Sequence, residues 1–292
     1  MKPLSRRKRY AYLVFCYALF LILIPVIVLY AEGYRIVPGP SLVKTGGIYI
    51  YETTNGASIF IDNKKTARLS ALSDNFFIQR LIPGIYNVRV QKDGFFPWEK
   101  EIAVYDGRVS ENASFLLPEK IYFTNISATS TLRAEESIKL VQEAEVLFSE
   151  KDTTNLLTNG QVLLLENLSR KVFTVVYSEK NDIFLVGGKE KTLEVLWRGS
   201  GRLPYFFCLY DMCSDSFSAF YLDQKILDAD FYPKREDVSV IRLTDGIYVA
   251  ELDRTPLQHI RMIYEGENLD FRLSDNRIYV KDGKYIYTAP LP

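Results

Sequence analysis

Apolar residues occur in two patterns along the chain. Near the N-terminus they form one continuous run, whereas the rest of the chain carries short runs in which apolar and polar positions alternate. Residues 11–31 (AYLVFCYALFLILIPVIVLYA) include no charged side chain. At about 1.5 Å of rise per residue, a helix of this length spans the roughly 30 Å hydrocarbon core of a bilayer. Residues 11–31 are therefore predicted to form a transmembrane helix.

The two flanks of this run differ in charge. Five basic residues precede it, and no acidic residue occurs before Glu32. The basic residues are Lys2, Arg6, Arg7, Lys8 and Arg9. Since the whole chain has 36 basic and 36 acidic residues, the part after residue 31 carries five net negative charges. Basic flanks stay in the cytoplasm, so these five residues are expected to determine the topology. Residues 1–10 are predicted to be a cytoplasmic tail, and the body is predicted to be extracytoplasmic.

A cleaved secretory signal is the alternative interpretation of the same run. The apolar region of such a signal has about 7–15 residues, which is shorter than the run seen here. Leu29, Tyr30 and Ala31 also match the small-x-small cleavage pattern poorly. An uncleaved anchor in the cell membrane is therefore favoured, and cleavage stays open.

The pattern changes after the helix. Residues 32–45 contain two glycines and two prolines and are predicted to be a linker or an edge segment. Short alternating runs follow, separated by the turn dipeptides at 55–56, 83–84, 93–94 and 106–107. The predicted strands are 48–51, 57–61, 76–78, 85–90, 101–104 and 113–117. Glycine is expected to supply a positive φ at turns such as those of Gly84 and Gly94. This spacing predicts a small antiparallel β-sandwich over residues 46–118.

Four segments of this region resemble the PEGA domain. They are 56–62 (GASIFID), 81–90 (LIPGIYNVRV), 92–95 (KDGF) and 104–117. The Pro-Glu-Gly-Ala turn that names the family is Thr54-Asn55-Gly56-Ala57 here, so only its Gly-Ala half is present. The resemblance implies a small β-sandwich of the kind found on prokaryotic surface proteins. Trp98 is expected to be a core residue rather than a ligand platform.

Residues 119–292 are predicted to form a second β-rich domain, which makes the fold class mainly β. Residues 132–148 are either a helix or a loop with strands. The predicted strands are 161–166, 171–177, 182–186, 192–197, 205–209, 219–222, 238–243, 247–252, 277–280 and 285–288. The hairpins around Asp245-Gly246 and Asp282-Gly283 share a pattern at an offset of 37 residues, and Asp-Gly favours type I′ turns.

The segment 226–233 (ILDADFYP) resembles the sequence with which a strand begins in TolB-like β-propeller repeats. A blade takes about 40 residues, so the resemblance and the length together imply a four- or five-blade or incomplete propeller. Stacked sheets remain the alternative to a closed propeller.

Candidate chemistry is sparse. The only histidine, His259, lies in an alternating run without a nearby nucleophile elbow, so no catalytic residue is predicted. Cys208 and Cys213 lack the further ligands of a zinc site. In an oxidising compartment they can form a disulfide, and two free thiols are the alternative. The carboxylate pairs Asp228/Asp230 and Glu251/Asp253 are expected to make structural hydrogen bonds. No metal or cofactor is predicted.

These features predict a non-catalytic, membrane-anchored protein of the cell envelope that binds or scaffolds a protein or polysaccharide partner. The acidic body argues against nucleic acid as a partner, because phosphate binding needs a basic surface. One alternative is an envelope hydrolase that uses Asp228, Asp230 or His259. Another is a sensor or assembly component whose helix pairs through small positions such as Ala18. The ligand and the oligomeric state stay open.

Overall fold

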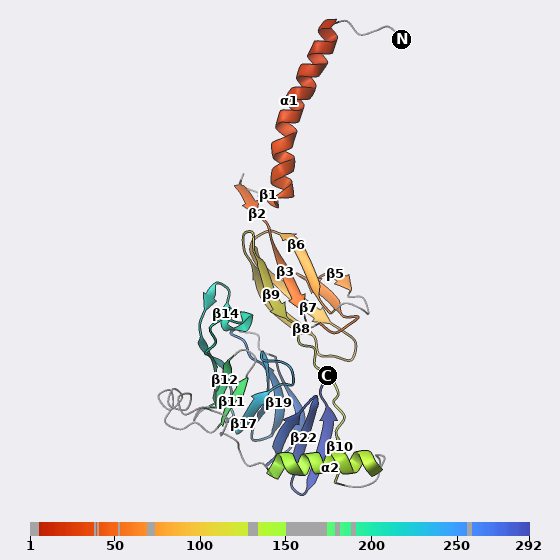
Figure 1. Cartoon of the computed structure of the whole chain (residues 1–292), viewed down its shortest axis with the longest axis vertical. Helices are drawn as coiled ribbons and strands as arrows, with labels where there is room; N and C mark the ends of the chain where they lie inside the picture. Colours follow the sequence, from red (N-terminus) through yellow and green to blue (C-terminus); the bar gives the residue numbers. More distant parts are fainter. Residues whose placement is uncertain are drawn as a thin grey trace. The chain divides into compact units, whose positions relative to one another are not determined.

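The computed structural model describes residues 6–37, 39, 41–51, 53–68, 74–127, 134–149, 174–178, 182–187, 191–255 and 259–292. By their internal contacts, the residues divide into two compact units. The first unit contains residues 1–88 and 101–114, and the second contains residues 89–100 and 115–292. The chain is mainly β, as the alternating pattern predicts (Figure 1).

The first unit begins with helix α1 (Arg6–Ala31), which covers the predicted apolar run and includes Pro25. An antiparallel hairpin follows, made of β1 (Tyr34–Val37) and β2 (Ser41–Lys44). Its base is closed by Thr45, whose backbone N–H and hydroxyl donate to the Gly33 carbonyl at 2.9 and 2.8 Å. The predicted linker at 32–45 therefore contains an ordered hairpin.

Two sheets follow the hairpin. Their strands are β3 (Gly46–Tyr51), β4 (Ser58–Ile61), β5 (Lys64–Arg68), β6 (Phe76–Leu81), β7 (Gly84–Gln91), β8 (Trp98–Val104) and β9 (Val109–Ala113). One sheet has the order β6-β3-β9 and the other has the order β5-β4-β7-β8. Buried residues alternate along the strands, as with Ile59 and Ile61 on β4. This is the pattern of sheets that each bury one face, as in a β-sandwich.

Three expectations for this region are wrong in detail. β3 and β9 pair in parallel, so the region is not purely antiparallel. Gly84 does not adopt a positive φ, whereas Gly94 does. Of the predicted strand at 113–117, only Ala113 lies in a strand, as the last residue of β9. The residues after it are buried elsewhere: Leu117 belongs to a core of the second unit, and its carbonyl accepts a hydrogen bond from Phe96 N–H at 2.9 Å.

The second unit contains three four-stranded antiparallel sheets in its described part. Their orders are β11-β12-β13-β16, β17-β18-β19-β20 and β10-β23-β22-β21. The strands of the first are β11 (Thr174–Ser178), β12 (Ile183–Gly187), β13 (Thr192–Trp197) and β16 (Ser216–Tyr221). Those of the second are β17 (Asp228–Phe231), β18 (Val238–Arg242), β19 (Gly246–Glu251) and β20 (Ile260–Glu265). The third has β10 (Thr124–Asn125), β21 (Asp270–Ser274), β22 (Arg277–Asp282) and β23 (Tyr285–Pro290).

The sheet β17-β18-β19-β20 lies between the other two and is buried on both faces. On one face, Ile241 and Ala250 join a core that also contains Leu185 and Val195 of the first sheet. On the opposite face, side chains of β18 and β19 join a second core with residues of β21, β22 and β23. Residues contributing to this second core are Val238, Val240, Ile247, Val249, Phe271, Ile278, Val280 and Ala289. The three sheets are therefore stacked face to face.

Helix α2 (Ala134–Ser149) covers the outer face of the third sheet. Leu140 and Ala144, one helical turn apart, are buried against Tyr279 of β22. Figure 1 shows α2 in green beside β10 and β22. Of the two alternatives for residues 132–148, a helix or a loop with strands, the structure shows the helix over Ala134–Ser149.

Other expectations for the second unit are corrected or untested. The strand predicted at 205–209 is instead a 3₁₀ turn (Tyr205–Phe207), preceded by Pro204, and the short strand β14 (Cys208–Leu209). The aromatic residues that suggested a strand, Phe206 and Phe207, are buried in the turn. Both Asp-Gly hairpins are present, but neither has the expected type I′ turn. Asp282 pairs with Tyr285, and φ is positive at Gly283 and not at Lys284, which fits a type II′ turn; φ is not positive at Asp245 or Gly246. The predicted strand at 161–166 lies outside the described residues. No closed propeller is seen in the described part of the chain.

Candidate functional site

Helix α1 is the first candidate site, as a membrane anchor. Among the described residues, it is the one helix long and apolar enough to cross a bilayer. None of its residues is buried in the protein. Its first turn carries four of the five predicted topology residues, Arg6, Arg7, Lys8 and Arg9, whereas Lys2 lies outside the described residues. The helix therefore presents an apolar surface with basic residues at one end.

A disulfide-closed hairpin is the second candidate. Cys208 and Cys213 lie opposite each other in the ladder between β14 and β15 (Met212–Cys213), and their Sγ atoms are bonded at 2.03 Å. The Arg254 guanidinium donates to the Met212 carbonyl at 2.8 Å, which ties the hairpin to the segment after β19. Tyr210 and Met212 are exposed on it. Such a cross-linked loop presents its side chains with little conformational freedom.

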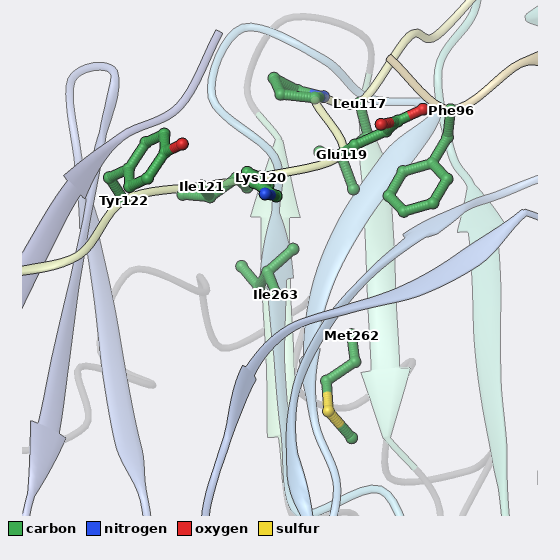
Figure 2. Close-up of a pocket in the computed structure, with 9 residues that line it drawn as sticks. Phe96, Leu117, Glu119, Lys120, Ile121, Tyr122, Met262 and Ile263 are labelled. Carbon is green, nitrogen blue, oxygen red and sulfur yellow. The ribbon is translucent and has the colours of Figure 1, made fainter. Parts of the chain in front are cut away.

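An open cleft beside β20 is the third candidate (Figure 2). Its volume is about 350 Å³. Met262 and Ile263 of β20 line one side, and the segment 117–122 passes over them. That segment is held by two backbone hydrogen bonds to residues 94–96, of 3.0 and 2.9 Å. The lining residues are Phe96, Leu117, Pro118, Glu119, Lys120, Ile121, Tyr122, Met262 and Ile263.

A buried ionic cluster lies at the end of β19. The Lys100 ammonium contacts Glu251 Oε2 at 3.4 Å and also contacts the Asp253 carboxylate. Trp98 donates its indole N–H to Glu251 Oε1 at 2.8 Å. The other oxygen of Asp253 accepts from the Thr255 backbone N–H and hydroxyl at 3.0 and 2.7 Å. We call Trp98, Lys100, Glu251 and Asp253 the lysine cluster.

Burial and charge act on the lysine cluster in opposite directions. Burial lowers the pKa of Lys100, but the charges of Glu251 and Asp253 outweigh it and keep the pKa above its ordinary value. Burial raises the pKa of Glu251 to about 7, although the Lys100 charge opposes this. The cluster therefore holds a permanently charged ammonium between carboxylates. A protonated lysine is not a nucleophile, and the ion pairs of Lys100 link β8 to the end of β19.

The structure does not bring the proposed hydrolase residues together. Asp228 and Asp230 lie on β17, one edge of their sheet, and each accepts a hydrogen bond from the backbone N–H that follows it. Burial raises the pKa of Asp230 to about 6. His259 directly precedes β20, the opposite edge, and its Nε2 atom is 3.0 Å from the Glu99 carbonyl oxygen. Burial lowers the pKa of His259.

The sequence identifies part of the lysine cluster. Trp98 is a buried core residue, as predicted, with 1% of its surface exposed. The spacing of Glu251 and Asp253 predicts two carboxylates on one side of the chain, and both do reach Lys100. The sequence analysis misses Lys100 as their partner, because it lies 153 residues from Asp253 and no local pattern indicates such a pair.

Comparisons with protein-family models, with curated proteins and with solved structures find no match for this chain. The resemblances to PEGA and TolB-like repeats therefore remain predictions from the sequence.

Proposed function

We propose that the chain is a membrane-anchored, non-catalytic protein of the cell envelope. Helix α1 crosses the membrane with its basic end in the cytoplasm. The two β units stand on the other side, where they bind a partner protein. The observation that carries this proposal is the exposed apolar helix α1, whose first turn is basic and which is followed directly by β structure.

The disulfide supports the extracytoplasmic location. Disulfides form and persist in oxidising compartments and are rare in the cytoplasm. The Cys208–Cys213 bond lies in the second unit, far along the chain from α1. The positive-inside rule and the disulfide thus agree on the same orientation by independent physical reasons.

The finer fold assignments belong to this proposal. A PEGA-like sandwich is supported by the two sheets of β3–β9, whose buried positions alternate. A propeller-like second domain is supported by three successive four-stranded antiparallel sheets, since a blade is such a sheet. Their face-to-face stacking is compatible with the incomplete form among the four-blade, five-blade or incomplete propellers that the length allows.

We propose the cleft beside β20 as the contact point for the partner. Apolar side chains such as Ile263 and Met262 line it together with Glu119 and Lys120, and its accessible surface is about half polar and half apolar. Methionine adapts to apolar side chains of different shapes, and Met262 is exposed in the cleft. A cleft that combines apolar side chains with a carboxylate and an ammonium suits a segment of a partner protein, because a protein offers both apolar and charged side chains.

The orientation is tested by protease digestion of intact cells that express the full chain with a C-terminal tag. We expect the tag to be digested from outside while the uncleaved chain stays in the membrane fraction, as judged by its mass. Replacing Arg6, Arg7, Lys8 and Arg9 by glutamine is expected to protect a large fraction of the tag, because the charge bias is removed. Replacing the exposed Lys64 and Lys65 by glutamine is the control and should change nothing.

Protection of the wild-type tag until lysis, in a host without an outer barrier, would refute the orientation. A mass that corresponds to cleavage near residue 31 would refute the anchor.

The cleft is tested by photo-crosslinking in intact cells. A benzophenone amino acid in place of Tyr122, which is 77% exposed, is expected to crosslink to a protein. The same replacement of Tyr285, exposed on β23, is the control and should not crosslink to it. Met262→Glu should reduce the Tyr122 product about tenfold or more, because a charge in an apolar contact costs at least about 1.4 kcal/mol. A product that resists protease but is cleaved by polysaccharide hydrolases would show that the partner is not a protein.

A further inference from the structure

The hairpin β1–β2 has one face with an amphipathic composition. Tyr34 lies opposite Lys44 in its ladder, and Ile36 lies opposite Leu42. Because side chains alternate along a strand, these four residues share one face. We call them the hairpin face. Ile36 is 82% exposed and Leu42 is 57% exposed, so an aliphatic pair stands in contact with solvent.

The hairpin face lies close to the end of α1 along the chain. Only Glu32 and Gly33 separate Ala31 from β1, which limits the distance between Ala31 and Tyr34 to about 11 Å at 3.8 Å per Cα step. The headgroup layer extends roughly 5–7 Å beyond the hydrocarbon on each side of a bilayer. If α1 crosses the membrane, the base of the hairpin therefore lies at the headgroup layer.

Contacts between aromatic and basic side chains connect the helix end to the hairpin. The Arg35 guanidinium lies 3.8 Å from the Tyr30 ring centroid and donates to the Tyr34 carbonyl at 2.8 Å. Arg80 of β6 lies 5.8 Å from the same ring. Lys44 lies 6.0 Å from the ring of Tyr34. Tyrosine is enriched at membrane interfaces, and arginine and lysine bind lipid phosphates there.

We propose that the hairpin face is a second membrane contact, which lies in the headgroup layer of the leaflet that α1 leaves. Ile36 and Leu42 point toward the acyl chains, and Tyr34 and Lys44 stay at headgroup level, since their polar ends remain hydrated while their apolar parts are buried. The ligand class is the phospholipid headgroup with the upper part of its acyl chain. This proposal rests on the proposed membrane anchor.

A second feature of the first unit fits the same partner. Two residues beyond Arg80, the turn between β6 and β7 exposes Ile82, and β7 exposes Ile85. Arg80 is close to Tyr30, so this turn starts near the end of the membrane helix. The exposed Ile82 and Ile85 thus add aliphatic side chains on a second element that starts near the end of α1. The only acidic residue in the segment 31–45 is Glu32.

The test uses the full chain in liposomes of phosphatidylcholine and phosphatidylglycerol, with brominated lipids as quenchers of tryptophan fluorescence. Three single variants each add one tryptophan: Ile36→Trp in the hairpin face, Leu21→Trp in α1, and Tyr122→Trp as a control with a similar exposure to Ile36. The native Trp98 and Trp197 contribute the same background to all three. Quenching of the added tryptophan in Ile36→Trp is expected to exceed that in Tyr122→Trp at least about twofold, since contact with lipid is required for it.

Each result leads to a distinct conclusion. If Leu21→Trp is quenched and Ile36→Trp behaves like Tyr122→Trp, the anchor is correct and the hairpin face is not a lipid contact; coverage by a second copy of the chain would give this result. If Leu21→Trp is not quenched either, the proposed anchor and the hairpin contact are both refuted. Ile36→Ser combined with Leu42→Ser should leave the anchor in the membrane and lower the quenching of a tryptophan placed at Tyr34.

Discussion

Replacing Lys100 by methionine is expected to lower the free energy of unfolding of the second unit by about 3–5 kcal/mol, the usual loss when one partner of a buried ion pair is removed. Lys100, Glu251 and Asp253 are all almost completely buried. Methionine keeps the apolar stem but lacks the charge. The two carboxylates would then remain in a dry environment without a cation, which is costly.

The loss can be measured by urea titration of the full chain in detergent. Both tryptophans, Trp98 and Trp197, belong to the second unit, so their fluorescence follows that unit alone. Lys120→Met, the same change at an exposed lysine, is the control and should stay within about 0.5 kcal/mol of the wild type. Adding Glu251→Gln and Asp253→Asn to Lys100→Met should restore more than half of the loss, because no buried charge is then left unpaired. A loss below about 1 kcal/mol in Lys100→Met would contradict the ionic role of the cluster.

The stability loss in Lys100→Met is also expected to depend on pH, in a direction that the pKa of Glu251 determines. Burial holds the pKa of Glu251 at about 7 in the folded chain, above its ordinary value of 4.5. A carboxyl whose pKa is raised on folding binds its proton more tightly in the folded state. Its contribution to stability is therefore fully present below the unfolded pKa and is lost as the pH rises through the folded pKa. In Lys100→Met the opposing ammonium is absent, so the stability deficit should be larger at pH 8 than at pH 5. A deficit that does not change with pH would mean that Glu251 is not the destabilised group.

Local sequence patterns predict the helices and strands that are recognisable from their own run of apolar and polar residues. α1 is predicted from an uninterrupted apolar run, and the β18–β19 hairpin is predicted from two β-rich runs around Asp245-Gly246. The apolar segment 115–117 is misassigned for the opposite reason. It is apolar because Leu117 fills a core between sheets, not because it pairs in a strand. Hydrophobicity makes burial favourable, but it does not show which partner buries a residue.

The candidate sites show the same limit. The two cysteines of the disulfide are close in sequence, so their pairing could be proposed from spacing together with the expected compartment. The lysine cluster joins residues that are 153 positions apart, and the cleft joins the segment 117–122 to β20. Such sites exist only through contacts between segments that are far apart in the sequence. A single sequence does not encode those contacts in any local signal.

Phe207→Ala is expected to have the second largest effect on the second unit, a loss of about 3–5 kcal/mol, as is typical for truncating a buried phenylalanine. The Phe207 ring is fully buried and lies 5.1 Å from the Phe217 ring in an edge-to-face arrangement. It belongs to the core between the first two stacked sheets of this unit, so its removal leaves a cavity where they meet.

The matched control lies in the adjacent disulfide hairpin. Met212 is 61% exposed, and Met212→Ala should change the stability by less than about 0.5 kcal/mol, because little apolar contact is lost. The urea midpoint of both variants can be read from the fluorescence of Trp98 and Trp197, which both belong to the second unit; Trp197 packs against the same core. If Phe207→Ala cost no more than Met212→Ala, the ring would not be part of a tightly packed core, and the face-to-face stacking of the sheets would be wrong at this position. A large loss confined to Phe207→Ala would show that this ring is tightly packed in the core, whereas the exposed side chain of Met212 contributes little to stability.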